Sequence, residues 1–253
     1  MAPHKHIFAS LGRGFSTPGI EETLTPSGDV NTDLLPETGV NAEVGVKFYW
    51  WEQKLFTGVT FFNTMVHNLL VAERIAEDQY VGINAGKTRH SGVEIDVHYH
   101  GLINDNWLLR PYFTLAINDF KFRDFKDNDI DYSGNEITGA PRSTASVGLE
   151  SEFVNGISFL VHLYHGGEIP LNDANSIYSD AYTLLDFKLS YKLSKLKNFP
   201  IRFYAGVNNV LNTAYTASVL PNAVGFGGAL PRYYYPGDAR NFYVGIIMRL
   251  QGR

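Results

Sequence analysis

The sequence contains no cysteine and no long apolar run. Without cysteine, the chain can form neither a disulfide framework nor a thiolate metal site. No apolar stretch approaches the roughly 20 residues that a membrane-spanning helix needs, which excludes a helical membrane protein. The formal net charge is −5, so the chain lacks the basic surface that nucleic acid requires, and no nucleic-acid partner is expected.

The first residues also lack a signal peptide. The start, Met1 to His6, carries no charged segment followed by an apolar one. Either a signal has been removed or the chain is part of a longer protein, and we favour the second interpretation. No Ser/Gly-rich linker divides the sequence, so residues 1–253 are expected to form one unit.

Alternation of apolar and polar residues runs through most of the chain, which is 44% hydrophobic and 14% aromatic. Side chains of a strand point to alternate faces, so each alternating segment predicts a strand with one apolar side. In the last segment, for example, Phe242, Val244 and Ile246 share a face. About ten strands are predicted, at residues 4–12, 40–50, 55–68, 88–100, 107–118, 143–153, 157–165, 182–192, 201–210 and 239–250.

The connections between these segments are alternately long and short. The long ones are residues 13–39, 69–87, 119–142, 166–181 and 211–238. Long loops on one rim and short turns on the other are typical of outer-membrane barrels, in which the short turns are periplasmic. Aromatic residues flank the short turns and predict a girdle at that rim: Trp50, Trp51, Tyr99, Trp107, Phe153 and Tyr191. The alternative is a soluble barrel whose aromatics merely fill strand positions.

The two faces of the predicted strands differ in polarity. Asp186, Lys188 and Lys192 would share one face of a single strand. Each Lys facing lipid at mid-depth would cost about 2–4 kcal/mol, so that face must meet water or protein. The opposite face is expected to meet outer-membrane lipid.

Several short segments resemble one family, and they follow one another in the family's order. They are residues 9–18, 34–38, 84–94, 139–142, 206–212 and 240–245. Together they resemble the C-terminal part of the barrel of TonB-dependent outer-membrane receptors. The resemblance implies an all-β fold, a transmembrane antiparallel barrel in which this chain supplies about ten of about 22 strands.

The resemblance also implies a function and partners. It implies import of an iron–siderophore or similar scarce chelate across the bacterial outer membrane, with energy supplied through TonB. The family's plug domain and TonB-contacting segment are expected outside these residues. One further departure is the end of the chain: the last apolar outward position is Leu250, whereas barrels of this kind usually end on an aromatic residue.

The long loops carry the candidate ligand-binding residues. Aromatic rings and arginine suit an anionic or catecholate iron chelate through stacking and charge. The candidates are Phe15, Tyr132, Tyr178, Phe226, Arg232, Tyr233 and Tyr234. An equal alternative is that residues 233–235 open the last strand and form the outer aromatic girdle. Arg142, directly after a proline, is predicted to be structural.

Other kinds of site find little support. His98 and His100 share a strand face, but no third metal ligand can be placed beside them. Ser143 and Ser146 have no histidine at a readable spacing, and Asp173 and Asp180 have no basic partner, so no catalytic motif is present. We therefore expect no metal site and no cofactor, and we do not expect the protein to be an enzyme. The alternative function is a small self-contained barrel that acts as a passive pore or a barrel enzyme.

Overall fold

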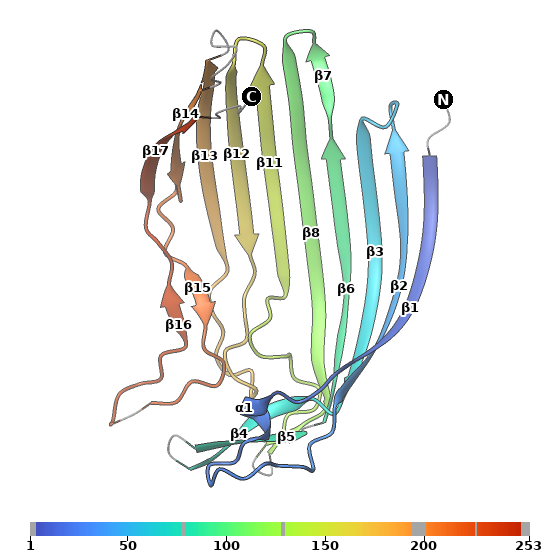
Figure 1. Ribbon diagram of the computed structural model, residues 1–253, viewed down its shortest axis with the longest axis vertical. Coiled ribbons are helices and arrows are strands. Elements are labelled where there is room, and N and C mark those ends of the chain that lie inside the picture. The colour runs from blue at the N-terminus through green and yellow to red at the C-terminus, as the bar shows by residue number, and fades with distance from the viewer. Residues whose placement is uncertain are drawn as a thin grey trace, which may run out of the picture.

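One large antiparallel sheet makes up most of the molecule (Figure 1). The computed structural model describes residues 4–76, 79–84, 86–127, 130–193, 201–225 and 227–248. All the predicted strands are present. They are β1 (His4–Ser16), β2 (Glu37–Trp50), β3 (Leu55–His67), β6 (Lys87–Tyr99), β8 (Trp107–Asp124), β11 (Ser143–Phe153), β12 (Ile157–Gly166), β13 (Tyr182–Leu193), β14 (Ile201–Asn208) and β17 (Asn241–Met248).

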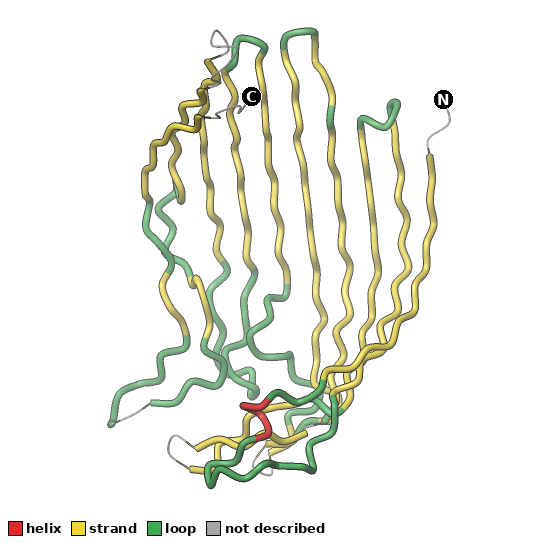
Figure 2. Tube along the Cα trace, viewed as in Figure 1, coloured by secondary structure: helices red, strands yellow, loops and turns green. Residues whose placement is uncertain are grey.

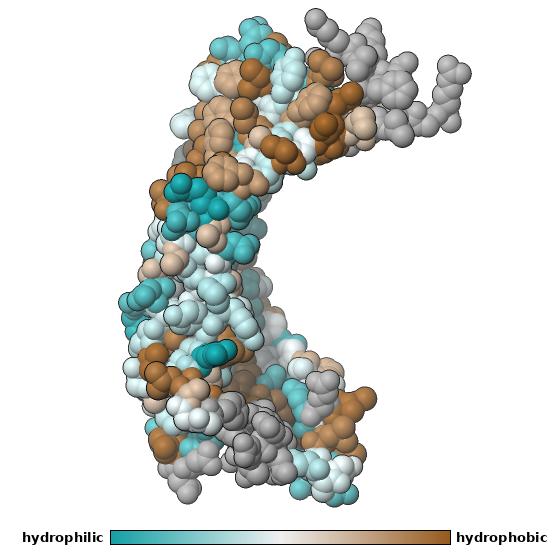
Figure 3. All heavy atoms as spheres, turned by 90° about the vertical axis from the view of Figure 1, so that its left-hand side faces the viewer, coloured by the Kyte–Doolittle hydropathy of each residue, from teal (hydrophilic) through white to brown (hydrophobic). Residues whose placement is uncertain are grey.

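Consecutive strands are neighbours across the sheet. The order is β1-β2-β3-β6-β8-β11-β12-β13-β14-β17, and the short strand β7 (Gly101–Asn104) pairs with β8 where β6 ends. Within the described residues, β1 and β17 form the two outer edges and do not pair with each other. The sheet is curved, and the side view shows a profile that is hollowed on one side (Figure 3).

Long loops gather at one end of the sheet and short turns at the other, as predicted (Figure 2). The long-loop end also carries small elements that the sequence analysis did not predict. They are α1 (Ile20–Thr23) and three hairpins: β4 (Leu70–Ala76) with β5 (Gln79–Asn84), β9 (Lys126–Asp127) with β10 (Ile130–Asp131), and β15 (Thr216–Val219) with β16 (Tyr234–Pro236). No helix in the described part of the chain is long and apolar enough to cross a membrane.

The cross-strand register places apolar side chains on one face over the whole width of the sheet. Val147 lies opposite Phe113 on one side and Leu163 on the other. The same row continues through Leu185 of β13. Many of these side chains are exposed, Val244 at 82%. An exposed apolar face of this extent is what a lipid-facing barrel wall requires.

The other face is polar, as predicted. Asp96 of β6 lies opposite Thr114 of β8, and the row continues through Ser146 and Tyr164. We call these the outer (apolar) and inner (polar) faces. The aromatic girdle beside the short turns lies on the outer face, where Trp107 stacks on Phe153 with ring centroids 5.7 Å apart.

A substitution series in β11 tests this assignment of faces. Val147→Lys on the outer face is expected to destabilise the folded protein in a bilayer by about 2–4 kcal/mol, because a lysine at mid-depth meets lipid. Ser146→Lys, one residue away on the inner face, is expected to change stability by less than about 0.5 kcal/mol. Urea-induced unfolding of the intact protein in vesicles measures both. Equal effects of the two substitutions would contradict the assignment.

Candidate functional site

Three long connections converge at the loop end, and Asp173 joins them. We call them loop A (residues 125–142), loop B (167–181) and loop C (209–240). Asp173 of loop B is buried, at 9% exposure. Its carboxylate accepts hydrogen bonds from Thr138 Oγ1 of loop A and from Asn222 Nδ2 of loop C, the latter at 2.8 Å. Its main-chain oxygen accepts from Asn135 Nδ2 at 2.7 Å. One side chain thus ties all three loops.

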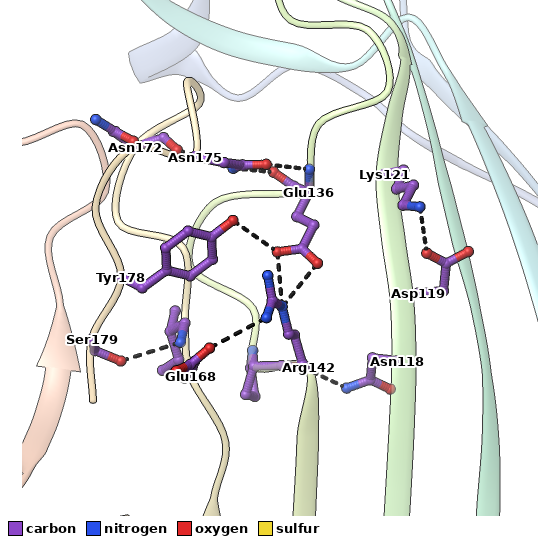
Figure 4. A network of polar contacts seen from close by, with 12 residues as sticks. Asn118, Asp119, Lys121, Glu136, Arg142, Glu168, Asn172, Asn175, Tyr178 and Ser179 are labelled. Carbon is purple, nitrogen blue, oxygen red and sulfur yellow. Dashed lines mark hydrogen bonds and ion pairs between the residues drawn. The ribbon is translucent and has the colours of Figure 1, made fainter. Parts of the chain in front are cut away.

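A second polar network links loops A and B around Arg142 (Figure 4). Arg142 Nε donates to Glu136 Oε1 and Oε2 at 2.9 and 3.0 Å, and Nη1 donates to Glu168 Oε2 at 3.2 Å. The Tyr178 hydroxyl donates to Glu136 Oε2 at 3.2 Å, and Arg142 Cζ lies 4.9 Å from the centroid of the Tyr178 ring. These contacts confirm the structural role predicted for Arg142.

The protonation states in this network favour its cohesion. The hydrogen bond to Glu136 raises the pKa of Arg142 above its usual value, so the guanidinium stays charged. Burial, followed by the nearby Glu136 charge, raises the pKa of the Tyr178 phenol, which keeps its proton as a donor at neutral pH. Asn175 bonds both main-chain groups of Glu136: its Oδ1 accepts from Glu136 N at 2.6 Å, and its Nδ2 donates to Glu136 O at 3.0 Å.

Loop C contributes a cavity of about 530 Å³ beside this network. Its lining is Leu220, Pro221, Asn222, Ala223, Val224, Ala229, Leu230 and Arg232. The volume is in the range of small-molecule sites. The two chain segments that enclose it are held by a hydrogen bond from Leu220 N to Tyr233 O at 2.7 Å and by the pairing of β15 with β16. Because Asn222 both lines the cavity and contacts Asp173, the cavity wall is anchored to loops A and B.

Arg232 is the cationic side chain of the cavity lining. It is exposed, and the described part of the chain offers it no ion pair. A guanidinium in that state can bind an anionic ligand without first leaving another partner. Tyr234 is 52% exposed in β16, within the same hairpin.

The structure brings together only part of the predicted ligand set. Tyr178, Arg232, Tyr233 and Tyr234 all belong to loops B and C, which Asp173 and Asn222 connect. Their binding role stays a prediction. Phe226 lies outside the described residues.

Two candidates lie elsewhere. Phe15 was placed in a loop, which is wrong: β1 continues to Ser16 and puts Phe15 on a strand, opposite Thr38, on the outer face and 76% exposed. Tyr132 belongs to loop A, but it packs against the buried cluster of Phe122 and Phe125, which gives it a structural role.

Sequence reasoning missed the residues that organise this site. Asp173 was weighed as an isolated carboxylate, and Glu136 and Asn222 were not considered. The only local signal is the run of Asn and Asp at residues 172–175, which favours turns. The predicted inner-face histidine His98 contacts Asp96, with Nε2 and Oδ1 3.5 Å apart. Among the described residues, no group of three His, Asp or Glu side chains could hold a metal ion.

Comparisons with known proteins agree with this architecture. The family model "TonB dependent receptor-like, beta-barrel" matches residues 2–210. The chain is 25% identical over 216 residues to the ferrichrome outer membrane transporter/phage receptor of Escherichia coli K12, a match that covers 82% of this chain and 27% of the relative.

Solved structures show the same fold. The ferric-catecholate import receptor Fiu of Escherichia coli K12 has a TM-score of 0.67 and 22% identity, covering 96% of this chain and 32% of that one. The ferric yersiniabactin uptake receptor FyuA of Yersinia pestis has a TM-score of 0.69 and 17% identity, covering 97% of this chain and 35% of that one. The chain therefore spans 27–35% of the length of these relatives.

Proposed function

We propose, from the premise that this chain belongs to the TonB-dependent receptor β-barrel family, that the whole protein imports an iron–siderophore or similar scarce chelate. The family and the fold place the chain in the bacterial outer membrane. The observation that carries the proposal is the loop-side cavity of about 530 Å³, whose lining arginine has no ion pair within the described residues and whose wall is tied by Asp173 to loops A and B.

The relatives support the choice of ligand class. One relative is named for ferrichrome, and two structural neighbours are named for a ferric catecholate and for ferric yersiniabactin. In all three, a ferric ion is bound by a small organic chelator. We propose that loops B and C receive such a ligand from the outside, with Arg232 meeting its negative charge and Tyr178, Tyr233 and Tyr234 offering ring faces.

The proposed activity is transport without chemistry on the ligand. The outer face meets outer-membrane lipid, and the inner face would border the path of the ligand. Unpaired strand edges are not viable in lipid, so we propose that further strands of the protein join β1 and β17 to complete a barrel of about 22 strands. The partner that supplies energy would be TonB, acting through a region N-terminal to this chain.

Equilibrium binding to the intact receptor in detergent tests the proposal. Ferric hydroxamate and ferric catecholate chelates would be titrated against the same chelators without iron. We expect one iron-loaded chelate to bind, and Arg232→Ala to weaken its binding about 10-fold, the usual scale for losing one charge-assisted hydrogen bond.

The control is Arg240→Ala, which removes an exposed arginine of the same loop at its far end. Its affinity should equal that of the unaltered receptor. If no iron-loaded chelate binds the intact receptor, the transport proposal is wrong. If a chelate binds but Arg232→Ala leaves its affinity unchanged, the function stands and the proposed site does not.

A further inference from the structure

A row of aromatic rings crosses the inner face from β3 to β12. The ring centroid of His98 on β6 lies 6.1 Å from that of Phe56 on β3 and 6.1 Å from that of Tyr112 on β8. Tyr112 in turn lies 6.2 Å from His162 on β12. All four follow one line of the cross-strand register, so they form an unbroken series on the inner wall.

A glycine on β11 makes this continuity possible. β11 lies between β8 and β12 and contributes no ring to the row, because the register partner of both Tyr112 and His162 is Gly148. The Tyr112 ring lies across this glycine, where any Cβ would overlap it. Neighbouring rings of the row are inclined to each other by only 21–36°. The rings therefore lie side by side along the wall of the barrel.

The series continues from β12 to loop C. Tyr164 follows His162 on the same face of β12, about 7 Å along the strand. The Tyr164 ring lies 6.0 Å from Tyr182 on β13, and Tyr182 lies 5.1 Å from Tyr215 of loop C. Tyr215 directly precedes β15, one strand of the hairpin that encloses the loop C cavity. We call the six residues on the wall the aromatic track: Tyr182, Tyr164, His162, Tyr112, His98 and Phe56.

The aromatic track descends from the loop side to the short-turn rim. Phe56 lies one position from Leu55, where β3 leaves its short turn, whereas His162 lies five positions from Ile157, where β12 leaves its own. At about 3.3 Å per residue, His162 is about 13 Å further from the rim along the strand. Such a slope is expected because strands of a barrel tilt by roughly 40°, so a row perpendicular to them runs obliquely around the wall. The track thus connects the two ends that a ligand must join during import.

The rings of the track are partly open to the barrel interior. The side chain of His98 is 50% exposed and that of His162 is 31% exposed. A carboxylate meets each imidazole at the ring edge: Asp96 Oδ1 lies 3.5 Å from His98 Nε2, and Asp186 Oδ2 lies 3.9 Å from His162 Nδ1. These contacts orient the rings without covering their faces. Inner walls of such barrels are polar, so an unbroken series of ring faces needs a reason of its own.

We propose, on the basis of the import function proposed above, that the aromatic track is a transit site for an aryl-bearing iron chelate, in which catechol or phenol rings hold the iron. Aryl rings stack on aromatic side chains in offset geometry, and tyrosine hydroxyl and imidazole N–H groups donate to the oxygens of such rings. With successive ring centroids about 5–6 Å apart, the ligand can take a new stacking partner before it leaves the previous one. A chelate made of aliphatic hydroxamates has no ring to stack.

Radioiron uptake by cells that carry the intact receptor, measured beside equilibrium chelate binding, tests this assignment. The probe is the ferric complex of a tris-catecholate chelator, and the ferric complex of an aliphatic tris-hydroxamate is the comparison. We expect the catecholate to be the chelate that is bound and imported. Tyr112→Leu should slow its uptake at saturation about 5-fold, the scale of one lost ring contact, and should leave the Kd at the loops unchanged. Tyr112→Phe keeps the ring and should keep the uptake rate.

Two further variants keep the test decisive. Phe56→Leu, at the short-turn end of the track, should slow uptake as Tyr112→Leu does. Tyr243→Leu is the matched control, because Tyr243 also lies over an inner-face glycine, Gly206, but pairs with Tyr204 outside the track. Its uptake rate should equal that of the unaltered receptor.

Several results would overturn the assignment. They are unchanged uptake in Tyr112→Leu, equal slowing in Tyr243→Leu, and slowing that appears only together with a lower melting temperature of the receptor, which would mean that the rings support the protein and not the ligand. Import of the ferric hydroxamate alone would also overturn it, while the proposed import function would stand. If neither chelate binds the intact receptor, the proposed function fails first and the track assignment fails with it.

Discussion

Gly86→Ala is expected to destabilise the loop side of the sheet by about 3–5 kcal/mol. Gly86 directly precedes β6 and has φ +80°, a left-handed conformation that costs a residue with a Cβ about 1–2 kcal/mol. An alanine Cβ at this position would also overlap the main-chain oxygen of Asp124 at the end of β8. Backbone cannot rotate away as a side chain can, so β6 and β8 would have to separate at their loop ends.

Substitutions at two other glycines separate the conformational cost of positive φ from the cost of the overlap with Asp124. Gly28 has nearly the same φ, +86°, but open space where its Cβ would lie. Gly28→Ala should therefore cost only the conformational part, about 1–2 kcal/mol. Gly14→Ala, with negative φ and open space, should change stability by less than about 0.5 kcal/mol.

Urea-induced unfolding of the intact receptor and hydrogen exchange of its amides measure the effect of Gly86→Ala. Faster exchange is expected first in the cluster beside Gly86, where Phe122 and Phe125 pack against Leu69, Val71, Ile83, Tyr132 and Ile137. Equal destabilisation by Gly86→Ala and Gly28→Ala would mean that the close approach to Asp124 is not what requires glycine.

The need for glycine at position 86 explains part of one segment, residues 84–94, that resembles the family. Within residues 84–94, Asn84 accepts a hydrogen bond from Leu35 N at 2.7 Å and donates to Asn68 O at 3.0 Å. Gly86 then allows the chain to pass against β8. The segment thus bonds two connections, the one between β1 and β2 that contains Leu35 and the one between β3 and β4 that contains Asn68, to the chain just before β6. Its sequence was sufficient for recognition, but its role became visible only in the structure.

The sheet could be predicted because its information is local. Alternation within single segments, as in β17, is enough to predict both the strand and its apolar face. Strand ends were less accurate, and β8 continues to Asp124 rather than ending at residue 118. Beyond Asn118 the alternation persists with its polarity reversed. The outer face now carries the polar residues Asp119 and Lys121, as expected where the membrane ends. Outside the membrane both faces of a strand meet water, so an apolar outer face no longer marks the strand, and its end cannot be predicted from that pattern.

The loop site could not be predicted because its contacts are distant in sequence. Asp173 is 35 residues from Thr138 and 49 from Asn222. Each of these residues is ordinary in a loop, and none has a local pattern that indicates its partner. Tyr178 and Arg232 could be listed as candidates from composition alone, whereas the side chains that hold their loops together required the fold.

The second large effect is expected from Asp173→Ala, which removes the shared acceptor of loops A, B and C. Asn222 Nδ2 and Thr138 Oγ1 would lose their acceptor in a largely buried place, which should lower the local stability of the loops by about 2–5 kcal/mol, the sum for two unsatisfied neutral donors. We expect hydrogen exchange of loops A, B and C to accelerate, while the unfolding transition of the sheet stays unchanged. The affinity for the iron chelate should fall at least about 10-fold, because binding would then have to order the loops.

Asp173→Asn is the matched comparison, since it keeps the shape and removes only the charge. Its remaining oxygen can accept from Asn222 Nδ2, while its new NH₂ group can donate to the Thr138 hydroxyl, which is able to accept as well as donate. The reverse arrangement is blocked, because Asn222 Oδ1 already accepts from Asp173 N at 3.0 Å and its amide cannot turn over without losing that bond. The asparagine variant should therefore lose only about 1 kcal/mol and retain most chelate affinity. If it fails as completely as the alanine variant, the negative charge of Asp173, and not its geometry as a three-loop acceptor, is what the site needs. If the alanine variant binds the chelate normally, the three loops do not act as one unit in recognition, and the ligand must be held by fewer of them.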